Sequence, residues 1–360
     1  MRLVIAAGGT GGHLFPGIAV AEAWKELDPA GEIFFVGSDR NREKEILQQE
    51  GYEHHSLSVG RMMGEGLASQ IRTFLTLPQS GWDAVKLLKQ LRPDVILGIG
   101  GYSSGPMVSA AFLKRIPRAI LEPNSIPGLT NRLLQVVSNR VFIAFPETAR
   151  FFSPRKTVLT GTPVRKKLST IGKNRSVPLD EKAFTIFILG GSQGATALNQ
   201  EMVRLLPSLK KEMGSRLRVI HQTGNQECES VKQAYQKAGV VSRVEPFIED
   251  MAPVYAEADI AVSRAGASTI AELVETGLPA ILIPYPHAAE DHQRFNALSI
   301  QEVGGAEMIL NRDLSTRLGP ALVHYFNHRD ELQTMRETLQ SLRKAPAATV
   351  IAKECLLLAS

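Results

Sequence analysis

Two glycine-rich segments contain the residues best suited to hold an anionic ligand. The first, residues 7–17, reads AGGTGGHLFPG and lies between a short apolar run and an amphipathic one. Its glycines let backbone N–H groups approach a ligand closely, and the N-terminus of the following helix adds positive potential. Pro16 suits the first turn of that helix. The spacing fits neither a Walker loop nor GxGxxG, so it predicts a phosphate-bearing ligand other than ATP or NAD.

His13 is the titratable side chain of this segment. At a helix N-terminus the positive end of the dipole disfavours an imidazolium, and a neutral imidazole can act as a general base. The alternative is a histidine that shapes the loop and donates a hydrogen bond to phosphate. The sequence leaves both open.

Composition limits the class of protein. The 360 residues exceed one ordinary core and suit two domains, with 44% apolar and 21% charged residues. A net charge of +5 favours anionic partners such as nucleotides, lipid diphosphates or an anionic membrane surface. Aromatic residues make up only 6%, and no RNA-binding signature occurs, so nucleic acid is not an expected partner. Cys228 and Cys355 lie far apart without a CxxC motif, which favours a reducing compartment without a disulfide or zinc site.

The chain enters its first strand directly, and this apolar run is too short for a signal peptide, so we expect a cytoplasmic protein. Residues 95–113 contain no charge. Glycines and Pro106 interrupt this stretch, which predicts a strand, a loop and a helix start in place of a membrane span.

Apolar runs alternate with amphipathic segments, which is the βαβ pattern of a parallel sheet. We expect a first helix ending near residue 27, helices from about 41 and 196, and strands at 2–7, 32–37, 94–99, 118–121, 140–145, 184–189, 218–222, 244–247, 258–263 and 279–284. The predicted loop 100–106 and the segment 122–124 follow strand ends. Ligands of such sheets bind outside the carboxyl ends of the strands, so these loops are expected to converge on one cleft.

The second half repeats the pattern of the first. Strand 184–189 leads into a second glycine segment, GGSQGA at 190–195, and a helix from about Thr196. The two glycine pairs begin at Gly8 and Gly190, half the chain apart. This predicts two similar α/β domains that face each other, with a hinge near 157–163.

Five motifs occur in order along nearly the whole chain: GGTGGH at 8–13, GGYSSGP at 100–106, GTPVR at 161–165, GGSQGA at 190–195 and RAGASTIAE at 264–272. Together they closely resemble the MurG family of bacterial cell-wall N-acetylglucosaminyltransferases. The resemblance implies a GT-B architecture, with two Rossmann-like domains whose parallel sheets face each other across a cleft. It further implies that residues 1–162 bind the lipid-linked acceptor and the membrane, that 163–340 bind UDP-N-acetylglucosamine, and that 341–360 form a helix packing back on the first domain.

The resemblance also implies a reaction. N-acetylglucosamine would pass with inversion from UDP-N-acetylglucosamine to the C4 hydroxyl of the N-acetylmuramyl-pentapeptide of lipid I, giving lipid II. His13 would take the proton from that hydroxyl. No metal and no cofactor are expected, and the chain has no Asp-x-Asp. The protein is expected to act at the cytoplasmic face of the inner membrane, to which it would bind peripherally.

Site residues follow from the same resemblance. Arg165 would stabilise the donor diphosphate, Glu272 would bind the ribose, the backbone of Ile248 would face uracil and Gln293 would bind sugar hydroxyls. The whole implied donor set is Thr10, Gly11, Gly12, Asn124, Arg165, Ser192, Ile248, Ser268, Thr269, Glu272 and Gln293. The implied acceptor and diphosphate set is Gly9, Gly101, Tyr102, Ser103 and Glu122.

Several of these residues have simpler interpretations. Ser192 could be the N-cap of the next helix, and residues 269–272 read as a capping box. Asn124 could form an Asx turn, Arg165 could be a surface arginine and Ile248 a core residue. The chain also departs from its relatives, with Pro123 and His292 in positions where glutamine often occurs.

Membrane contact is expected from apolar residues of the first half with a basic rim. They are Phe74, Leu75, Leu77, Trp82, Phe112, Leu113, Lys114 and Arg115. Core burial is the alternative for most of them. Other activities compatible with the motifs are a GT-B enzyme with another lipid acceptor such as diacylglycerol, a UDP-N-acetylglucosamine 2-epimerase, and a UDP-binding regulatory module without catalysis.

Overall fold

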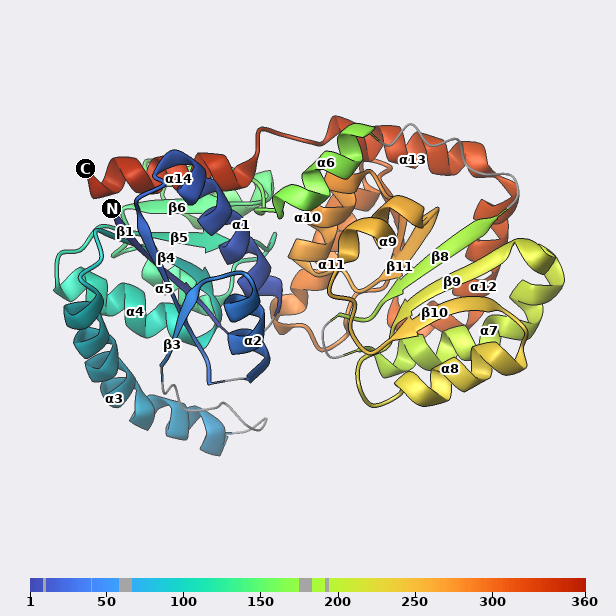
Figure 1. Cartoon of the computed structure of the whole chain (residues 1–360), viewed down its shortest axis with the longest axis horizontal. Coiled ribbons are helices and arrows are strands. Elements are labelled where there is room, and N and C mark those ends of the chain that lie inside the picture. The colour runs from blue at the N-terminus through green and yellow to red at the C-terminus, as the bar shows by residue number, and fades with distance from the viewer. Residues whose placement is uncertain (9–10, 40, 58–66, 175–182, 192–193) are drawn as a thin grey trace. The chain divides into compact units, whose positions relative to one another are not determined.

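The chain forms two compact units, each with its own parallel sheet (Figure 1). The computed structural model describes residues 1–8, 11–39, 41–57, 67–174, 183–191 and 194–360. The first unit comprises Met1–Arg165 and Lys344–Ser360, and the second comprises Lys166–Arg343.

The described part of the first unit contains a seven-stranded sheet of order β3-β2-β1-β4-β5-β6-β7, in which every pairing is parallel. Its strands are β1 Arg2–Ala7, β2 Glu32–Gly37, β3 Glu53–Ser56, β4 Val95–Gly100, β5 Arg118–Glu122, β6 Arg140–Ile143 and β7 Thr157–Leu159. The helices are α1 Gly11–Leu27, α2 Asn41–Gln49, α3 Leu67–Leu91, α4 Gly101–Leu113, α5 Leu129–Leu134 and α14 Ala347–Ala359, with a 3₁₀ turn η1 Pro146–Phe151.

Side chains of the central strands alternate between two hydrophobic cores, one on each face of the sheet. In β1, Leu3 and Ile5 enter the core shared with α1, whereas Val4 and Ala6 enter the core shared with α3 and α4. Both faces are covered by helices, which is why these strands read as continuous apolar runs.

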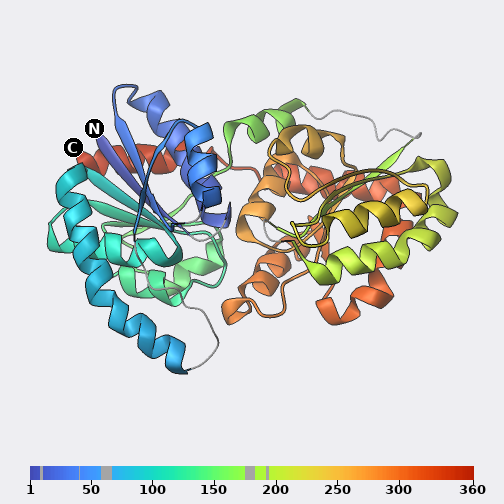
Figure 2. The same cartoon turned by 60° about the horizontal axis from the view of Figure 1, so that its bottom comes forward.

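The last helix, α14, belongs to the first unit although the second unit precedes it in the chain. It packs against α1 and places Ile351, Ala352 and Cys355 in the same core (Figures 1 and 2). Arg140 at the start of β6 donates to Glu354 of α14, with Nε and Oε2 3.1 Å apart. The first core is therefore completed by the C-terminal segment.

The second unit, as described, has a six-stranded parallel sheet of order β10-β9-β8-β11-β12-β13. The strands are β8 Phe184–Leu189, β9 Leu217–Gln222, β10 Val241–Glu245, β11 Ile260–Ser263, β12 Ala280–Leu282 and β13 Ala306–Met308. The helices are α6 Lys166–Asn174, α7 Thr196–Met213, α8 Cys228–Lys237, α9 Met251–Glu257, α10 Ala267–Thr276, α11 His292–Gln301, α12 Leu314–Asn327 and α13 Arg329–Ser341, with 3₁₀ turns η2 Gly214–Arg216, η3 Ala289–Asp291 and η4 Asn311–Asp313.

The prediction of two α/β domains with parallel sheets is confirmed, but two local predictions are wrong. Helix α1 begins at Gly11, so Pro16 lies at its sixth position, beyond the first turn. The segment 100–106 is not a loop, because α4 starts at Gly101 directly after β4 and includes Pro106. The hinge near 157–163 stays a prediction: residues 157–159 form strand β7, and the boundary between the two units falls after Arg165.

None of the described helices is both long enough and apolar enough to cross a membrane. The strand and the helix start that were predicted in the uncharged stretch 95–113 are confirmed, because this stretch forms strand β4 and helix α4.

Candidate active site

The two glycine segments follow the central strands of the two sheets. In each sheet the chain first adds strands on one side of its first strand and then adds the remaining strands on the other side. The direction of the strand order therefore reverses between β1 and β4 in the first sheet and between β8 and β11 in the second. Open α/β sheets bind ligands outside the carboxyl ends of the strands at this switch point. The first glycine segment follows β1, and the second follows β8.

His13 lies at the first switch point. It is the third residue of α1, and its imidazole packs on Gly100 at the end of β4. A Cβ on Gly100 would lie 3.0 Å from both Cδ2 and Nε2 of the ring. The half-buried His13 side chain is therefore located where α1 and α4 both begin.

The turns after β1 and β4 are in direct contact. Gly101 has φ +75°, and a Cβ on it would overlap the carbonyl oxygen of Gly8. The Gly8 position is equally confined, because a Cβ there would lie 3.2 Å from Ser103 Oγ. Glycine is required at Gly101 by both the backbone conformation and the space.

Three consecutive residues of α4 differ in their environment. Tyr102 is exposed, whereas Ser103 is buried and its hydroxyl has no hydrogen-bond partner among the described residues. Ser104, which the motif analysis did not single out, lies with Oγ 2.8 Å from the Ala6 carbonyl and accepts from the Gly100 N–H at 2.9 Å. Ser104 therefore joins the ends of β1 and β4.

Glu122, at the end of β5, organises the loop that follows. Its carboxylate is buried and accepts from Asn124 N at 3.0 Å, Asn124 Nδ2 at 3.1 Å, Gly128 N at 3.2 Å and Asn131 Nδ2 at 2.9 Å. Burial raises the pKa of Glu122, and the four donors oppose that shift. Both Glu122 and the side chain of Asn124 are thus used in shaping the loop, with the Asn124 amide held against a carboxylate.

Arg165 is the last residue of the amino-terminal segment of the first unit, and it is not a plain surface residue. Its guanidinium lies over the ring of Phe15 of α1, 4.2 Å from the ring centroid. The cation–π contact holds this positive charge beside the helix that carries His13. Sequence alone gave no signal for the pairing, because 150 residues separate the two partners.

The second switch point has its own confined turn. Gly191 and Gly194 have φ values of +89° and +81°, and the Gly194 N–H donates to the Gly191 carbonyl at 3.1 Å. A Cβ on Gly194 would overlap the carbonyl oxygen of Thr223 after β9. Helix α7 has Ala195 as its N-cap, so the interpretation of Ser192 as that N-cap is wrong.

One side-chain amide joins Ile248, the residue expected near uracil, to the second glycine turn. Gln222, the last residue of β9, accepts from the Ile248 N–H at 2.9 Å and donates to the Gly191 carbonyl at 3.0 Å. Ile248 is buried, so the interpretation of its side chain as core is correct. Gln222 was expected only as part of a strand.

A buried polar network lies beside this amide. His221 Nδ1 and Nε2 lie 3.1 Å from Tyr235 Oη and 3.0 Å from Asn199 Oδ1. Asn199 of α7 in turn donates to the Thr223 carbonyl and to Glu227 Oε2, both at 2.9 Å. The network ties α7 and α8 to the end of β9, which supports the second glycine turn.

This network predicts a pH-dependent stability. Burial lowers the pKa of His221 to about 3, whereas the ordinary value of about 6.5 applies to the unfolded chain. Between these values the unfolded state takes up a proton that the folded state does not. The contribution of neutral His221 is complete above pH 6.5 and is lost as the pH falls, at up to about 1.4 kcal/mol per pH unit.

Urea unfolding of the wild type and His221→Gln between pH 7.5 and 4.5 measures this term. The variant is expected to be less stable at pH 7.5 but to lose less stability on acidification, because its side chain does not titrate. Parallel pH curves for the two proteins would contradict the assignment.

Helix α10, after β11, carries three of the implied donor residues. Its N-cap is Gly266, so half-buried Ser268 and Thr269 lie in the first turn and Glu272 lies one turn further on. The capping-box interpretation of 269–272 is therefore wrong. Glu272 instead accepts a hydrogen bond from Tyr255 of α9 at 2.7 Å, which fixes the orientation of its carboxylate.

Gln293, in the first turn of α11, accepts from the Tyr285 N–H at 2.9 Å and so fixes the chain after β12. His292 Nδ1 lies 2.7 Å from the Ala289 carbonyl, and the ring of His287 packs edge-on against Tyr285. These local contacts account for both histidines.

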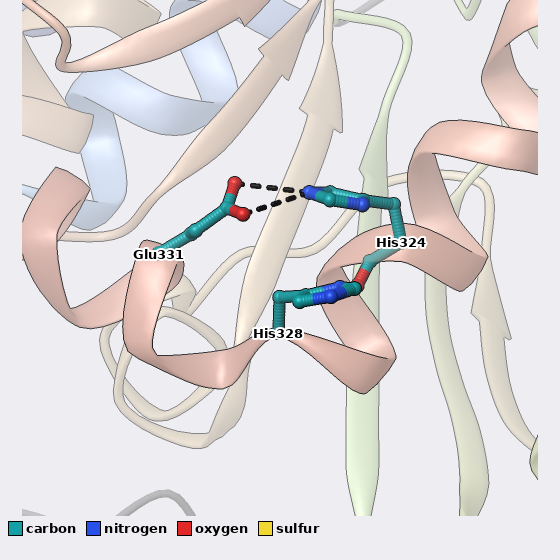
Figure 3. Close-up of side chains that lie close together, drawn as sticks. All are labelled: His324, His328 and Glu331. Carbon is teal, nitrogen blue, oxygen red and sulfur yellow. Dashed lines mark hydrogen bonds and ion pairs between the residues drawn. The ribbon is translucent and has the colours of Figure 1, made fainter.

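One group of potential metal ligands occurs among the described residues: His324, His328 and Glu331, at the junction of α12 and α13 (Figure 3). His324 Nε2 is 3.0 Å from both carboxylate oxygens of Glu331, and His328 Nδ1 is 2.9 Å from the His324 carbonyl. The two rings are stacked, 4.3 Å between centroids and 23° between planes. Because nitrogen lone pairs lie in the ring plane, stacked rings do not direct them to one point. The group forms a hydrogen-bonded helix junction.

Three implied site residues, Gly9, Thr10 and Ser192, lie outside the described residues. Gly11 and Gly12 are the first two residues of α1. In the first unit, His13, Gly101, Ser103 and the N-terminus of α1 therefore lie at the ends of β1 and β4. In the second unit, Gly191, Ile248 and α10 follow the ends of β8, β10 and β11.

The chain matches two family descriptions that together span most of its length. Residues 3–143 match the glycosyltransferase family 28 N-terminal domain, and residues 185–351 match the glycosyltransferase family 28 C-terminal domain. Each match includes one glycine segment and most of its sheet.

Relatives extend the similarity over the whole chain. The UDP-N-acetylglucosamine–N-acetylmuramyl-(pentapeptide) pyrophosphoryl-undecaprenol N-acetylglucosamine transferase of Syntrophus aciditrophicus is 42% identical, over 99% of this chain and 98% of that protein. The enzyme of the same name from Trichlorobacter lovleyi is 38% identical over 99% and 98%. The crystal structure of Acinetobacter baumannii MurG superposes with a TM-score of 0.74 at 28% identity, covering 99% of this chain and 100% of that one.

The same fold occurs in UDP-N-acetylglucosamine 2-epimerase from Neisseria meningitidis, with a TM-score of 0.67 at 14% identity over 99% and 100% of the two chains. At this identity the likeness shows the fold alone.

Two parallel Rossmann-like sheets, each with a glycine turn at its switch point, define the GT-B fold, and the two family matches place the chain among the glycosyltransferases that have it. Within that class, the chain belongs to glycosyltransferase family 28, among the MurG N-acetylglucosaminyltransferases.

Proposed function

We propose that the chain transfers N-acetylglucosamine from UDP-N-acetylglucosamine to the C4 hydroxyl of the N-acetylmuramyl-pentapeptide of lipid I, forming lipid II. The observation that carries the proposal is the pair of glycine turns at the two switch points, in a chain with 38–43% identity to transferases of that name. Each turn, with its helix N-terminus, suits one diphosphate. The donor and the lipid acceptor each contain one.

His13 is proposed as the general base. It removes the proton of the acceptor hydroxyl as the oxygen attacks C1 of the donor sugar, and UDP departs from the opposite face with inversion. The position of His13 in the first turn of α1 favours a neutral imidazole. Gly9, Gly101, Tyr102, Ser103 and Glu122 are proposed to form or shape the acceptor diphosphate site beside it.

The donor is proposed to bind the second unit through Ser192, Ile248, Ser268, Thr269, Glu272 and Gln293, together with Thr10, Gly11, Gly12, Asn124 and Arg165 of the first. The guanidinium of Arg165 would oppose the negative charge that grows on departing UDP. Tyr255 holds the Glu272 carboxylate in one orientation, as recognition of the ribose hydroxyls requires.

The decisive experiment incubates the protein with labelled UDP-N-acetylglucosamine and a lipid I analogue. Labelled disaccharide product with a β-1,4 link is expected, with little transfer from other UDP-sugars. Conversion of the donor to UDP-N-acetylmannosamine, or its hydrolysis by water to N-acetylmannosamine and UDP, without an acceptor would favour the epimerase. UDP binding without any transfer would favour a regulatory module.

We also propose that the first unit binds the cytoplasmic membrane surface through the ends of α4 and α5. Exposed apolar residues gather there, with 48–75% of each residue accessible: Phe112, Leu113, Leu129, Leu133 and Val136. Arg118 links them, because its guanidinium lies 5.0 Å from the Phe112 ring centroid and donates to the Val137 carbonyl. Lys114, Arg115, Arg132 and Lys156 supply positive charge around this α4–α5 surface.

An apolar surface with a basic rim suits an interface rich in anionic lipid. Trp82 of α3 is also exposed, in keeping with the expectation for this residue. The side chains of Phe74, Leu75 and Leu77 lie outside the described part of the structure.

Vesicle flotation tests the α4–α5 surface. The wild type is expected to float with phosphatidylglycerol vesicles, and Leu113→Glu/Leu133→Glu to lose at least tenfold in bound fraction, because two exposed apolar side chains that would enter the lipid become charged. Leu357→Glu is the control, since Leu357 is equally exposed on α14. Equal flotation of the double variant and the control would refute the surface, as would a wild type that stays unbound.

A further inference from the structure

Gln222 connects two segments that follow different strands of the second sheet. Its side chain is buried, with 2% of the residue exposed. The amide Nε2 donates to the carbonyl of Gly191, after β8, and the amide oxygen accepts from the N–H of Ile248, after β10. One side chain at the end of the strand between them therefore sets the spacing of both segments.

The bond to Gly191 has an electrostatic consequence. The Gly191 carbonyl accepts from both the buried Gln222 amide and the Gly194 N–H. Its negative end is thereby directed into the protein. A turn that binds an anion must turn its carbonyls inward in this way, because an outward carbonyl would repel the ligand.

The two partners also fix which end of the amide faces which segment. A carbonyl needs a donor and an N–H needs an acceptor, so only a neutral group with both functions satisfies the pair. A leucine or methionine satisfies neither partner. An ionised glutamate satisfies Ile248 but opposes the Gly191 carbonyl.

We propose that Gln222 is a positioning residue for the nucleoside diphosphate donor, which keeps the diphosphate turn at Gly191 and the base-facing segment at Ile248 in binding register. The inference rests on the proposed function, because it assumes that the donor occupies this end of the second sheet. Gln222 acts through these two segments without touching the reacting atoms.

The test compares Gln222→Glu and Gln222→Met with wild type at pH 7.5. Both are expected to raise KM for UDP-N-acetylglucosamine and Kd for UDP by about tenfold to thirtyfold, the loss expected of two neutral hydrogen bonds. Both kcat and KM for the lipid I analogue should stay within about threefold of wild type. Gln236→Met is the matched control, because Gln236 is exposed on α8.

A pH profile separates positioning from a general structural role. A protonated glutamic acid has one donor and one acceptor, so Gln222→Glu should regain UDP affinity as the pH is lowered towards 5.5, relative to wild type at each pH. Gln222→Met should show no such recovery. UDP affinity is measured by calorimetry, so this readout remains valid even if no transfer to lipid I is found.

Two results would overturn the proposal. One is a folded Gln222→Met protein that binds UDP as tightly as wild type. The other is an equal loss of donor and acceptor binding in both variants without recovery of Gln222→Glu at low pH, which would identify Gln222 as a general packing residue of the second unit.

Discussion

Replacement of His13 by alanine is expected to lower kcat for transfer by about 10²–10⁴-fold, the usual contribution of a general base. UDP affinity should stay near that of wild type, because His13 belongs to the first unit and packs on Gly100. Steady-state rates with the lipid I analogue give the first quantity, and calorimetry with UDP gives the second.

The pH profile distinguishes a base from a residue that only shapes the turn. In the wild type kcat/KM should fall on the acidic side as His13 becomes protonated, and this limb should be missing from the residual activity of His13→Ala. His324→Ala, an exposed histidine of the second unit, serves as the control. An almost fully active His13→Ala protein would remove His13 from the mechanism.

Gly101→Ala is expected to cost the first unit about 3–5 kcal/mol of unfolding free energy. The added Cβ would overlap the Gly8 carbonyl oxygen, and the φ of +75° is strained for any residue with a Cβ. Strain and overpacking each cost about 1–3 kcal/mol, and they add at this position. Acceptor binding should be lost as well, because relief of the overlap separates the turns after β1 and β4.

Gly105→Ala provides a control in the same helix. A Cβ there would meet only Thr130 Cγ2, at an ordinary 3.7 Å, so this variant should be as stable as wild type or gain up to about 1 kcal/mol. Urea unfolding of the wild type, Gly101→Ala and Gly105→Ala measures the unfolding free energy of each protein. Equal stability of both variants would show that the turns after β1 and β4 can separate without cost.

The sequence predicted the central strands of both sheets well, because residues buried on both faces give uninterrupted apolar runs. It did not predict β3 and β13, whose sequences EHHS and AEM lie at sheet edges and carry polar residues. It also placed loops where α1 and α4 begin. Glycine and proline usually interrupt helices, but Gly11, Gly12 and Gly101 lie in the first turns, where few intrahelical hydrogen bonds depend on them. Pro16 and Pro106, each at the sixth position of its helix, each remove only one intrahelical hydrogen bond.

For the site, the motifs indicated which strand ends carry polar and glycine residues but not the partners of their side chains. Glu272 fits a capping box in sequence, yet in the structure it meets Tyr255, which belongs to another helix. Arg165 over Phe15 and Gln222 between Gly191 and Ile248 likewise join residues far apart in the chain. Such contacts depend on tertiary packing, and local spacing contains no information about them.

The return of α14 to the first unit affects the order in which the nascent protein can mature. The second unit is one continuous segment, 166–343, and all of it is synthesised before the last helix. The apolar side of the first sheet that packs against Ile351 and Cys355 stays uncovered until α14 has been made. The amino-terminal half, although synthesised first, therefore finishes folding only after α14 has been made, and a chain that lacks α14 would have an open core.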